Sequence, residues 1–81
     1  MFFVYVLYSR TFDIYYIGQT KHLEQRILRH NNGLENFTKK YVPWELKFYL
    51  IKDTRSEALQ LEKKLKNLTR DRLKQFISKY S

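Results

Sequence analysis

Hydrophobic residues follow two distinct periods along the chain, which predict three strands and three helices. Residues 2–8 and 14–18 are rich in β-branched and aromatic side chains, and the polar residues 9–13 between them predict a hairpin turn. Residues 44–52 alternate between apolar and polar side chains, which is typical of a third strand. We expect one face of this strand to carry Trp44, Leu46, Phe48 and Leu50.

Two adjacent tyrosines in the second strand must point to opposite faces of the sheet, because side chains alternate along a strand. We expect Tyr16 to lie beside Tyr5 on one face. Tyr15 should then pack on the opposite face together with Ile17. Gly18 is expected to let the chain turn tightly into the following helix.

The first helix is expected over residues 21–32. Thr20 can serve as its N-cap, and the Asn-Asn-Gly sequence at 31–33 tolerates a left-handed end. Its apolar stripe should face the sheet, but Arg26 and His30 occupy two positions of that stripe. Each has an ordinary structural explanation, since an arginine can extend its head group to water and a histidine near a helix C-terminus complements the helix dipole.

The second helix begins at the capping-box sequence of residues 54–57 and runs to about Leu68. Its buried stripe includes Glu62, and a carboxylate in that position should be paired or bind a metal. The ordinary alternative is a surface ion pair with Lys66, one turn further on. A third, amphipathic helix is expected over about residues 71–79. Its inward side chains should be Leu73, Phe76 and Ile77.

The predicted order of elements is β-β-α-β-α-α, an α+β fold in which helices flank a small three-stranded antiparallel sheet. A chain of 81 residues suits a single domain, 1–81, with one small core. The absence of cysteine excludes disulfides and thiolate metal sites, and fits a reducing cytoplasm. We expect a cytoplasmic protein with no membrane association, because no apolar run could span a bilayer and no charged secretory leader is present.

The net charge is strongly positive, with 16 Lys and Arg against 8 Asp and Glu, or +8 at pH 7. Residues 63–79 contribute seven basic side chains and one acidic side chain. This charge favours nucleic acid as a partner, although a basic run on a helix is more often only a solvated face. The candidate nucleic-acid-binding residues are Lys39, Lys40, Lys63, Lys66, Arg70, Arg72 and Lys74.

Five polar residues become informative when they are taken together. Tyr5 and Tyr16 stand on the two arms of the hairpin, while Arg26, His30 and Glu62 come from helices that should pack against it. Their sequence contexts, FVY, YIG, the R and H of the first helix and SEALQLE, resemble the GIY-YIG nuclease superfamily over essentially the whole chain. The stretches YVLYS, FTKKY and PW are similar to the small stand-alone bacterial members.

The resemblance implies the family's three-stranded fold and its activity, which is divalent-metal-dependent hydrolysis of phosphodiester bonds in DNA. It implies Glu62 as the sole protein ligand of one Mg²⁺ or Mn²⁺ ion, and Arg26 as the phosphate contact. It also implies that Tyr5 and Tyr16 flank the attacking water, and His30 matches a further polar position of the site.

These residue types suit the chemistry. Mg²⁺ prefers oxygen ligands and keeps several waters, so one carboxylate and a substrate oxygen can hold it. An arginine offers several donors to the phosphate. A tyrosine, with an ordinary pKa near 10, needs cationic neighbours to act as a base. Either Tyr5 takes the proton from water, as the family favours, or Tyr5 positions the water and His30 takes the proton. Phe3 stands where the family's name-giving glycine would be.

Two hypotheses follow. The first is a DNA endonuclease, selective for branched or nicked DNA in repair or recombination, which reaches DNA through its basic C-terminal residues or through a targeting protein. The second is a nucleic-acid-binding or protein-interaction module that keeps the fold with little or no turnover, and RNA also stays open as a substrate. The presence of Glu62 favours the nuclease, because a carboxylate repels phosphate when no cation is bound.

Overall fold

The computed structural model describes residues 1–80 and contains a three-stranded antiparallel sheet. β1 (Phe2–Ser9) is the central strand, and it pairs with β2 (Ile14–Thr20) on one side and β3 (Glu45–Lys52) on the other. Both outer strands are therefore edges of the sheet.

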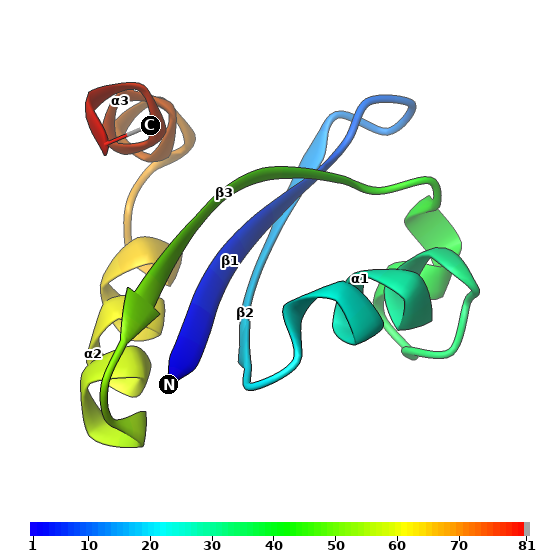
Figure 1. The fold of residues 1–81 in the computed structure, drawn as a ribbon. Coiled ribbons are helices and arrows are strands. Elements are labelled where there is room, and N and C mark those ends of the chain that lie inside the picture. Colours follow the sequence, from blue (N-terminus) through cyan, green and yellow to red (C-terminus); the bar gives the residue numbers. More distant parts are fainter. Residues whose placement is uncertain (81) are drawn as a thin grey trace.

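Helices cover both faces of this sheet (Figure 1). α1 (Leu23–Asn31) and the short 3₁₀ helix η1 (Thr38–Tyr41) lie on one face. α2 (Arg55–Lys66) and α3 (Arg70–Tyr80) lie on the other. The predicted α+β class and the order β-β-α-β-α-α are confirmed, with η1 added between α1 and β3.

The central strand separates two packed layers because its side chains alternate. Val4 and Val6 point to the α2 and α3 face, whereas Tyr5 and Leu7 point to the α1 face. All four are buried, since helices cover β1 from both sides. The larger apolar core contains Val4, Val6, Ile17, Phe48, Ala58, Leu65 and Leu73.

The hairpin register places the two adjacent tyrosines as predicted. Tyr16 is opposite Leu7, on the α1 face that also holds Tyr5. Tyr15 and Ile17 pack against the core on the other face. The two adjacent tyrosines of β2 therefore pack in different layers, Tyr16 on the α1 face and Tyr15 on the opposite face.

The prediction that one face of the third strand carries its four alternate apolar residues is wrong. Phe48 is opposite Val6 and Leu46 is opposite Leu7, which leaves Lys47 without a partner on β1. Because of this bulge, Leu46 and Phe48 lie on opposite faces of the sheet, although they are two positions apart. As a result Trp44 joins the α1-side cluster, whereas Phe48 packs in the core on the other face.

The predicted start of the first helix is also wrong. Thr20 is the last residue of β2, and α1 begins only at Leu23. The Thr20 hydroxyl accepts a hydrogen bond from the His22 N–H at 3.1 Å, so it stabilises a local turn rather than the helix. The end of α1 is as expected, because Gly33 has a φ of +73° in the left-handed region.

The capping sequence of α2 is confirmed, since the Thr54 hydroxyl accepts a hydrogen bond from the Glu57 N–H at 3.2 Å. α2 ends at Lys66, slightly earlier than predicted. Arg70, at the start of α3, donates to the carbonyl of Asp13 at 2.9 Å and to its carboxylate, which ties α3 to the hairpin turn. The side chains that α3 directs toward the core are the predicted Leu73, Phe76 and Ile77.

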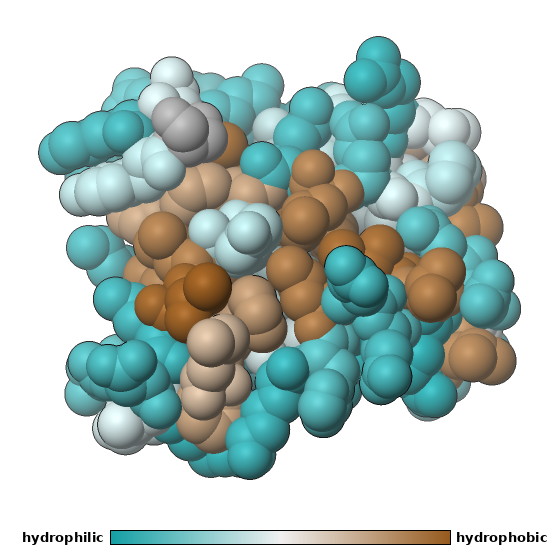
Figure 2. All heavy atoms as spheres, viewed as in Figure 1, coloured by the Kyte–Doolittle hydropathy of each residue, from teal (hydrophilic) through white to brown (hydrophobic). Residues whose placement is uncertain are grey.

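The β3 edge exposes several apolar side chains. Leu46, Tyr49 and Ile51 are each at least 37% exposed. Figure 2, seen with β3 in front, shows apolar surface across the middle of this side with hydrophilic residues around it. No helix within residues 1–80 is long and apolar enough to cross a membrane.

Candidate functional site

The hydroxyl of Tyr5 lies directly over the backbone of Gly18, the residue paired with it on β2. A Cβ atom at position 18 would be 2.6 Å from the Tyr5 hydroxyl oxygen and 2.8 Å from Cζ, so only glycine leaves room for the ring. The prediction that Gly18 makes a tight turn is therefore wrong. Gly18 lies inside β2, and its role is to accommodate a fully buried phenol.

Tyr16 stands at the centre of an aromatic group on the α1 face. The centroid of its ring is 6.4 Å from that of Tyr5 and 5.0 Å from that of His30. The ring of Phe37, the residue just before η1, stacks on the Tyr16 ring, and the two ring centroids are 6.0 Å apart. Unlike Tyr5, Tyr16 is only partly buried, so its ring can meet both the core and a bound molecule.

His30 is held between two hydroxyl groups in the last turn of α1. Its Nε2 lies 2.9 Å from the Tyr5 hydroxyl, and its Nδ1 lies 2.7 Å from the Thr38 hydroxyl. All three side chains are at most 1% exposed. A neutral imidazole has one donor and one acceptor nitrogen, so this chain of hydrogen bonds has a definite direction in each tautomer.

Trp44 fixes the segment that carries Thr38. Its indole N–H donates to the Thr38 carbonyl at 2.9 Å. The Asn31 side chain accepts from the Trp44 backbone N–H at 2.6 Å and donates to the Trp44 carbonyl at 3.0 Å. The sequence placed Asn31 at the end of a helix and Trp44 on a strand, and it did not predict these contacts, because they join segments that meet only in the folded chain.

Burial sets the protonation of the two inner groups. Burial raises the pKa of Tyr5, the nearby phenol of Tyr16 raises it further, and the charge of Arg26 opposes the change. Burial lowers the pKa of His30; Arg26 and Arg29 also lower it, while Glu35 raises it. At neutral pH, Tyr5 is therefore a neutral phenol and His30 a neutral imidazole.

Arg26 connects this buried group to a cavity at the end of β2. It lies one turn before His30 on α1, close enough to Tyr5 to influence its pKa. It also lines a cavity of about 340 Å³ together with Gln19, and this cavity is polar. Four of the five candidates, Tyr5, Tyr16, Arg26 and His30, are thus brought together on the α1 side.

Glu62 approaches the same strand from the opposite layer. Its side chain is 16% exposed, its Oε1 accepts from the Gln19 amide at 3.0 Å, and its Oε2 pairs with the Lys66 ammonium at 2.7 Å. Gln19 follows Gly18, over which the Tyr5 hydroxyl lies. No described hydrogen bond or ion pair within residues 1–80 joins Glu62 directly to the two catalytic tyrosine candidates.

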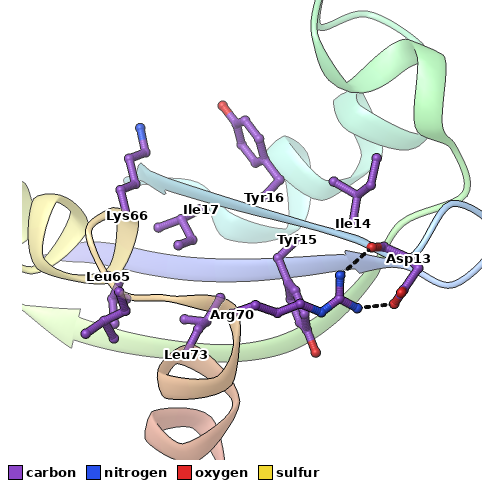
Figure 3. A pocket seen from close by; sticks show the side chains of 10 residues that line it. Asp13, Ile14, Tyr15, Tyr16, Ile17, Leu65, Lys66, Arg70 and Leu73 are labelled. Carbon is purple, nitrogen blue, oxygen red and sulfur yellow. Dashed lines mark hydrogen bonds and ion pairs between the residues drawn. The ribbon is translucent and has the colours of Figure 1, made fainter.

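The edge position of β2 brings the two layers near one another. Lys66, the partner of Glu62, lines a cavity of about 430 Å³ together with Tyr16. Figure 3 shows Lys66 and Tyr16 extending to the same side of the strand, while Tyr15 points to the other side. Both partners of Glu62 therefore line cavities. Gln19 lines the 340 Å³ cavity together with Arg26, and Lys66 lines the 430 Å³ cavity together with Tyr16.

The Glu62 carboxylate could hold a divalent cation in place of the Lys66 ammonium, which pairs with its Oε2. Within the described part of the chain, no group of three or more His, Cys, Asp or Glu side chains could hold a metal ion. A single carboxylate leaves the remaining positions to water and phosphate oxygens, which suits Mg²⁺ and Mn²⁺ and does not suit structural zinc.

The seven predicted nucleic-acid-binding residues are all exposed but differ in their contacts. Lys66 is paired with Glu62, and Arg70 with Asp13. Lys39 and Lys40 lie on η1, which directly follows Phe37 of the aromatic group. The others, on α2 and α3, are Lys63, Arg72 and Lys74.

Comparison with known proteins identifies the class. Residues 1–76 match the GIY-YIG catalytic domain. The chain therefore belongs to the GIY-YIG family, whose nucleases generally use a divalent metal and act on nucleic acid. The predicted family is confirmed, including the resemblance to its small bacterial members.

The most informative relatives are UPF0213 proteins. The chain is 34% identical over 77 residues to one from Staphylococcus saprophyticus, covering 94% of this chain and 93% of the relative. It is 35% identical over 82 residues to one from Clostridium perfringens, covering 100% and 87%. The solution NMR structure of UPF0213 protein BH0048 from Bacillus halodurans is similar with a TM-score of 0.65 and 27% identity, covering 99% of this chain and 86% of that one.

Proposed function

We propose that this protein is a DNA endonuclease that hydrolyses phosphodiester bonds with one divalent cation, Mg²⁺ or Mn²⁺. The observation that carries the proposal is the convergence of Tyr5, Tyr16, Arg26 and His30 at the edge strand against which Glu62 is held. A pair of phenols, a guanidinium and a carboxylate at one edge provide the groups that phosphodiester hydrolysis needs.

Arg26 binds the non-bridging oxygens of the scissile phosphate. Its guanidinium stays charged at every working pH and supplies several donors to the charge that grows on these oxygens. Glu62 would hold the cation, which would neutralise charge on the phosphate and on the leaving oxygen. Lys66 and Gln19 keep the carboxylate of Glu62 oriented toward β2.

Tyr5 and His30 handle the proton of the attacking water. His30 is neutral, so its Nε2 can accept the hydroxyl proton of Tyr5, with Nδ1–H donating to Thr38. The phenolate oxygen then takes a proton from water as the water oxygen forms its bond to phosphorus. The bond between phosphorus and the leaving oxygen breaks, and the leaving oxygen takes a proton from solvent. Burial raises the pKa of Tyr5 and lowers that of His30, so the transfer depends on stabilisation of the phenolate by the charge of Arg26.

Cleavage assays test the proposal. Purified protein is incubated with supercoiled, nicked and branched DNA, with Mg²⁺ or Mn²⁺ or with EDTA. We expect metal-dependent cleavage that Glu62→Gln and Arg26→Ala reduce by at least about 100-fold, the typical scale for loss of one transition-state contact. Glu24→Gln removes an exposed charge from α1 and Arg10→Ala removes one from the hairpin turn, and both variants should cleave like the parent. Cleavage that survives Glu62→Gln would refute the assigned site.

A non-catalytic binding module is the second candidate, and one observation favours it. Lys66 already neutralises the Glu62 carboxylate at 2.7 Å, so the edge of β2 can approach a phosphate without a cation. This candidate predicts binding of DNA in EDTA and no cleavage of any substrate with any metal. The same assay, read by both electrophoresis and binding, separates the two.

The remaining assignments complete the proposal. Residues 1–81 act as a single catalytic domain in the cytoplasm, and the substrate is DNA whose branched or nicked shape is recognised in repair or recombination. Shape-selective binding requires contacts to phosphates and no reading of bases. The exposed basic residues of η1, α2 and α3 supply backbone affinity, supplemented where needed by a targeting protein.

A further inference from the structure

A basic cavity extends beyond the proposed catalytic residues at the C-terminal end of β2. It measures about 340 Å³, and its lining includes Arg26 and Gln19, together with Lys21, His22 and Arg55. Arg55 begins α2, whereas the others belong to β2, α1 and the turn between them. Figure 1 shows these chain segments at the same end of the sheet, beside the N-terminus.

Two of the cations are gathered over one aromatic ring. The Lys21 ammonium lies 5.1 Å from the centroid of the Phe2 ring, and the Arg55 guanidinium carbon lies 5.6 Å from it. They come from separate elements, so the ring of Phe2 brings together charges that would otherwise repel each other. Phe2 also lines the cavity, which places both head groups at its wall.

The cations of this cavity have no acidic partner within the described chain. The ion pairs of residues 1–80 do not include Lys21, Arg26 or Arg55. Other basic groups, such as Lys63 and Arg72, are also in no described ion pair, but they do not line this cavity. Uncompensated like charges in one concave site raise the local positive potential and favour an anionic ligand.

We propose that Lys21 and Arg55 form a second phosphate-binding subsite, which holds the backbone phosphate next to the scissile one. The inference rests on the proposed nuclease function, because Arg26 is shared by the cavity and the catalytic group, and Gln19 holds Glu62. The nucleic-acid strand therefore runs from the edge of β2 toward the first turn of α2. Arginine and lysine contacts of this kind position the strand without reading its bases.

Binding measured without cleavage tests the subsite. The full chain carrying Glu62→Gln is titrated in EDTA with a fluorescent DNA duplex, and anisotropy gives the Kd between 50 and 200 mM salt. We expect Lys21→Ala with Arg55→Ala to weaken binding and to reduce the slope of log K against log salt by about 2, near 1 for each lost phosphate contact. Arg10→Ala with Lys47→Ala removes the same charge from two exposed residues that pair with Glu45 and do not line the cavity, and it should change the slope by much less.

Three further measurements control for loss of charge, loss of folding and the type of nucleic acid. Lys21→Arg with Arg55→Lys keeps the charge and should retain most of the binding, while thermal unfolding checks that every variant is folded. DNA and RNA strands of one sequence should lose affinity alike, because the contact is to phosphate. The inference is overturned if the cavity variant binds like the parent, if the variant of Arg10 and Lys47 loses as much, or if the loss is confined to one nucleic acid. A parent that binds DNA but never cleaves it refutes the proposed nuclease, whereas a parent that cleaves while the cavity variant binds normally overturns the subsite alone.

Discussion

The two faces of the sheet are built from alternate residues of the same central strand, yet they differ in chemistry. On the α2 and α3 face, Val4 and Val6 pack into an apolar core. On the α1 face, Tyr5 takes part in a buried chain of hydrogen bonds to His30 and Thr38. The apolar face can stabilise the fold by burial alone, so the other face is free to hold polar groups in fixed positions.

The largest effect on stability is expected on the apolar face. Leu65→Ala removes a side chain that is 1% exposed, and should lower the free energy of unfolding by about 2–5 kcal/mol through lost burial and a residual cavity. Urea denaturation measures it. Leu59→Ala, an exposed leucine on the same helix, is the matched control and should change stability by less than about 0.5 kcal/mol. Equal losses at the two positions would contradict the assigned core.

The next effect tests the tightest contact on the polar face. Gly18→Ala introduces a Cβ that would lie 2.6 Å from the Tyr5 hydroxyl oxygen, and the buried ring has no free space to move into. We expect a loss of about 1–3 kcal/mol in stability, together with a loss of cleavage. Tyr5→Phe in the same chain removes the closest atom and should recover part of the stability. A stable and active Gly18→Ala variant would show that Tyr5 can be displaced.

Removal of the Thr38 hydroxyl sharpens the comparison further. Thr38→Val keeps the shape but leaves the Nδ1 of His30 without its partner, at an expected cost of about 1–3 kcal/mol in stability. Nitrogen NMR of the imidazole should report a change in tautomer. Thr38→Ser keeps the hydroxyl and should restore the original spectrum. An unchanged spectrum in Thr38→Val would show that Thr38 does not orient His30.

The smallest effect is a pH dependence of stability that comes from the polar face. Burial holds the pKa of His30 below its ordinary value of 6.5, so the unfolded chain binds a proton more readily than the folded one. The free energy of unfolding should therefore be fully maintained above about pH 6.5 and decrease as the pH falls below it. Urea titrations from pH 8 to 5 measure this. His30→Gln should flatten the curve, whereas His22→Gln, an exposed control, should not.

Much of the fold followed from local sequence signals. The aromatic and β-branched runs predicted the hairpin, and the Thr54 cap predicted the start of α2, because both depend on neighbouring residues. The prediction that Thr20 caps the first helix was wrong for the same reason, since a residue type that favours helix N-caps also occurs at the end of a strand. The bulge at Lys47 carries no such signal, because it depends on pairing between β1 and β3.

The candidate site was predictable only in part. Arg26, His30 and Glu62 were predicted because they interrupt apolar stripes, and Tyr5 and Tyr16 because they stand on the two arms of the hairpin. All five match the family pattern, and their catalytic roles stay predictions. The residues that hold these side chains in place were not predicted. Contacts such as those of Gln19 with Glu62 and of Thr38 with His30 join segments that are distant in the chain or separated by a loop, and no periodicity reveals them.

The bulge in β3 lets a single edge strand supply one large aromatic ring to each layer. Trp44, before Lys47, packs in the α1-side cluster, and Phe48, after it, packs in the core on the other face. In a regular strand these two side chains, four positions apart, would lie on the same face. One extra residue therefore anchors β3 in both layers of a very small fold.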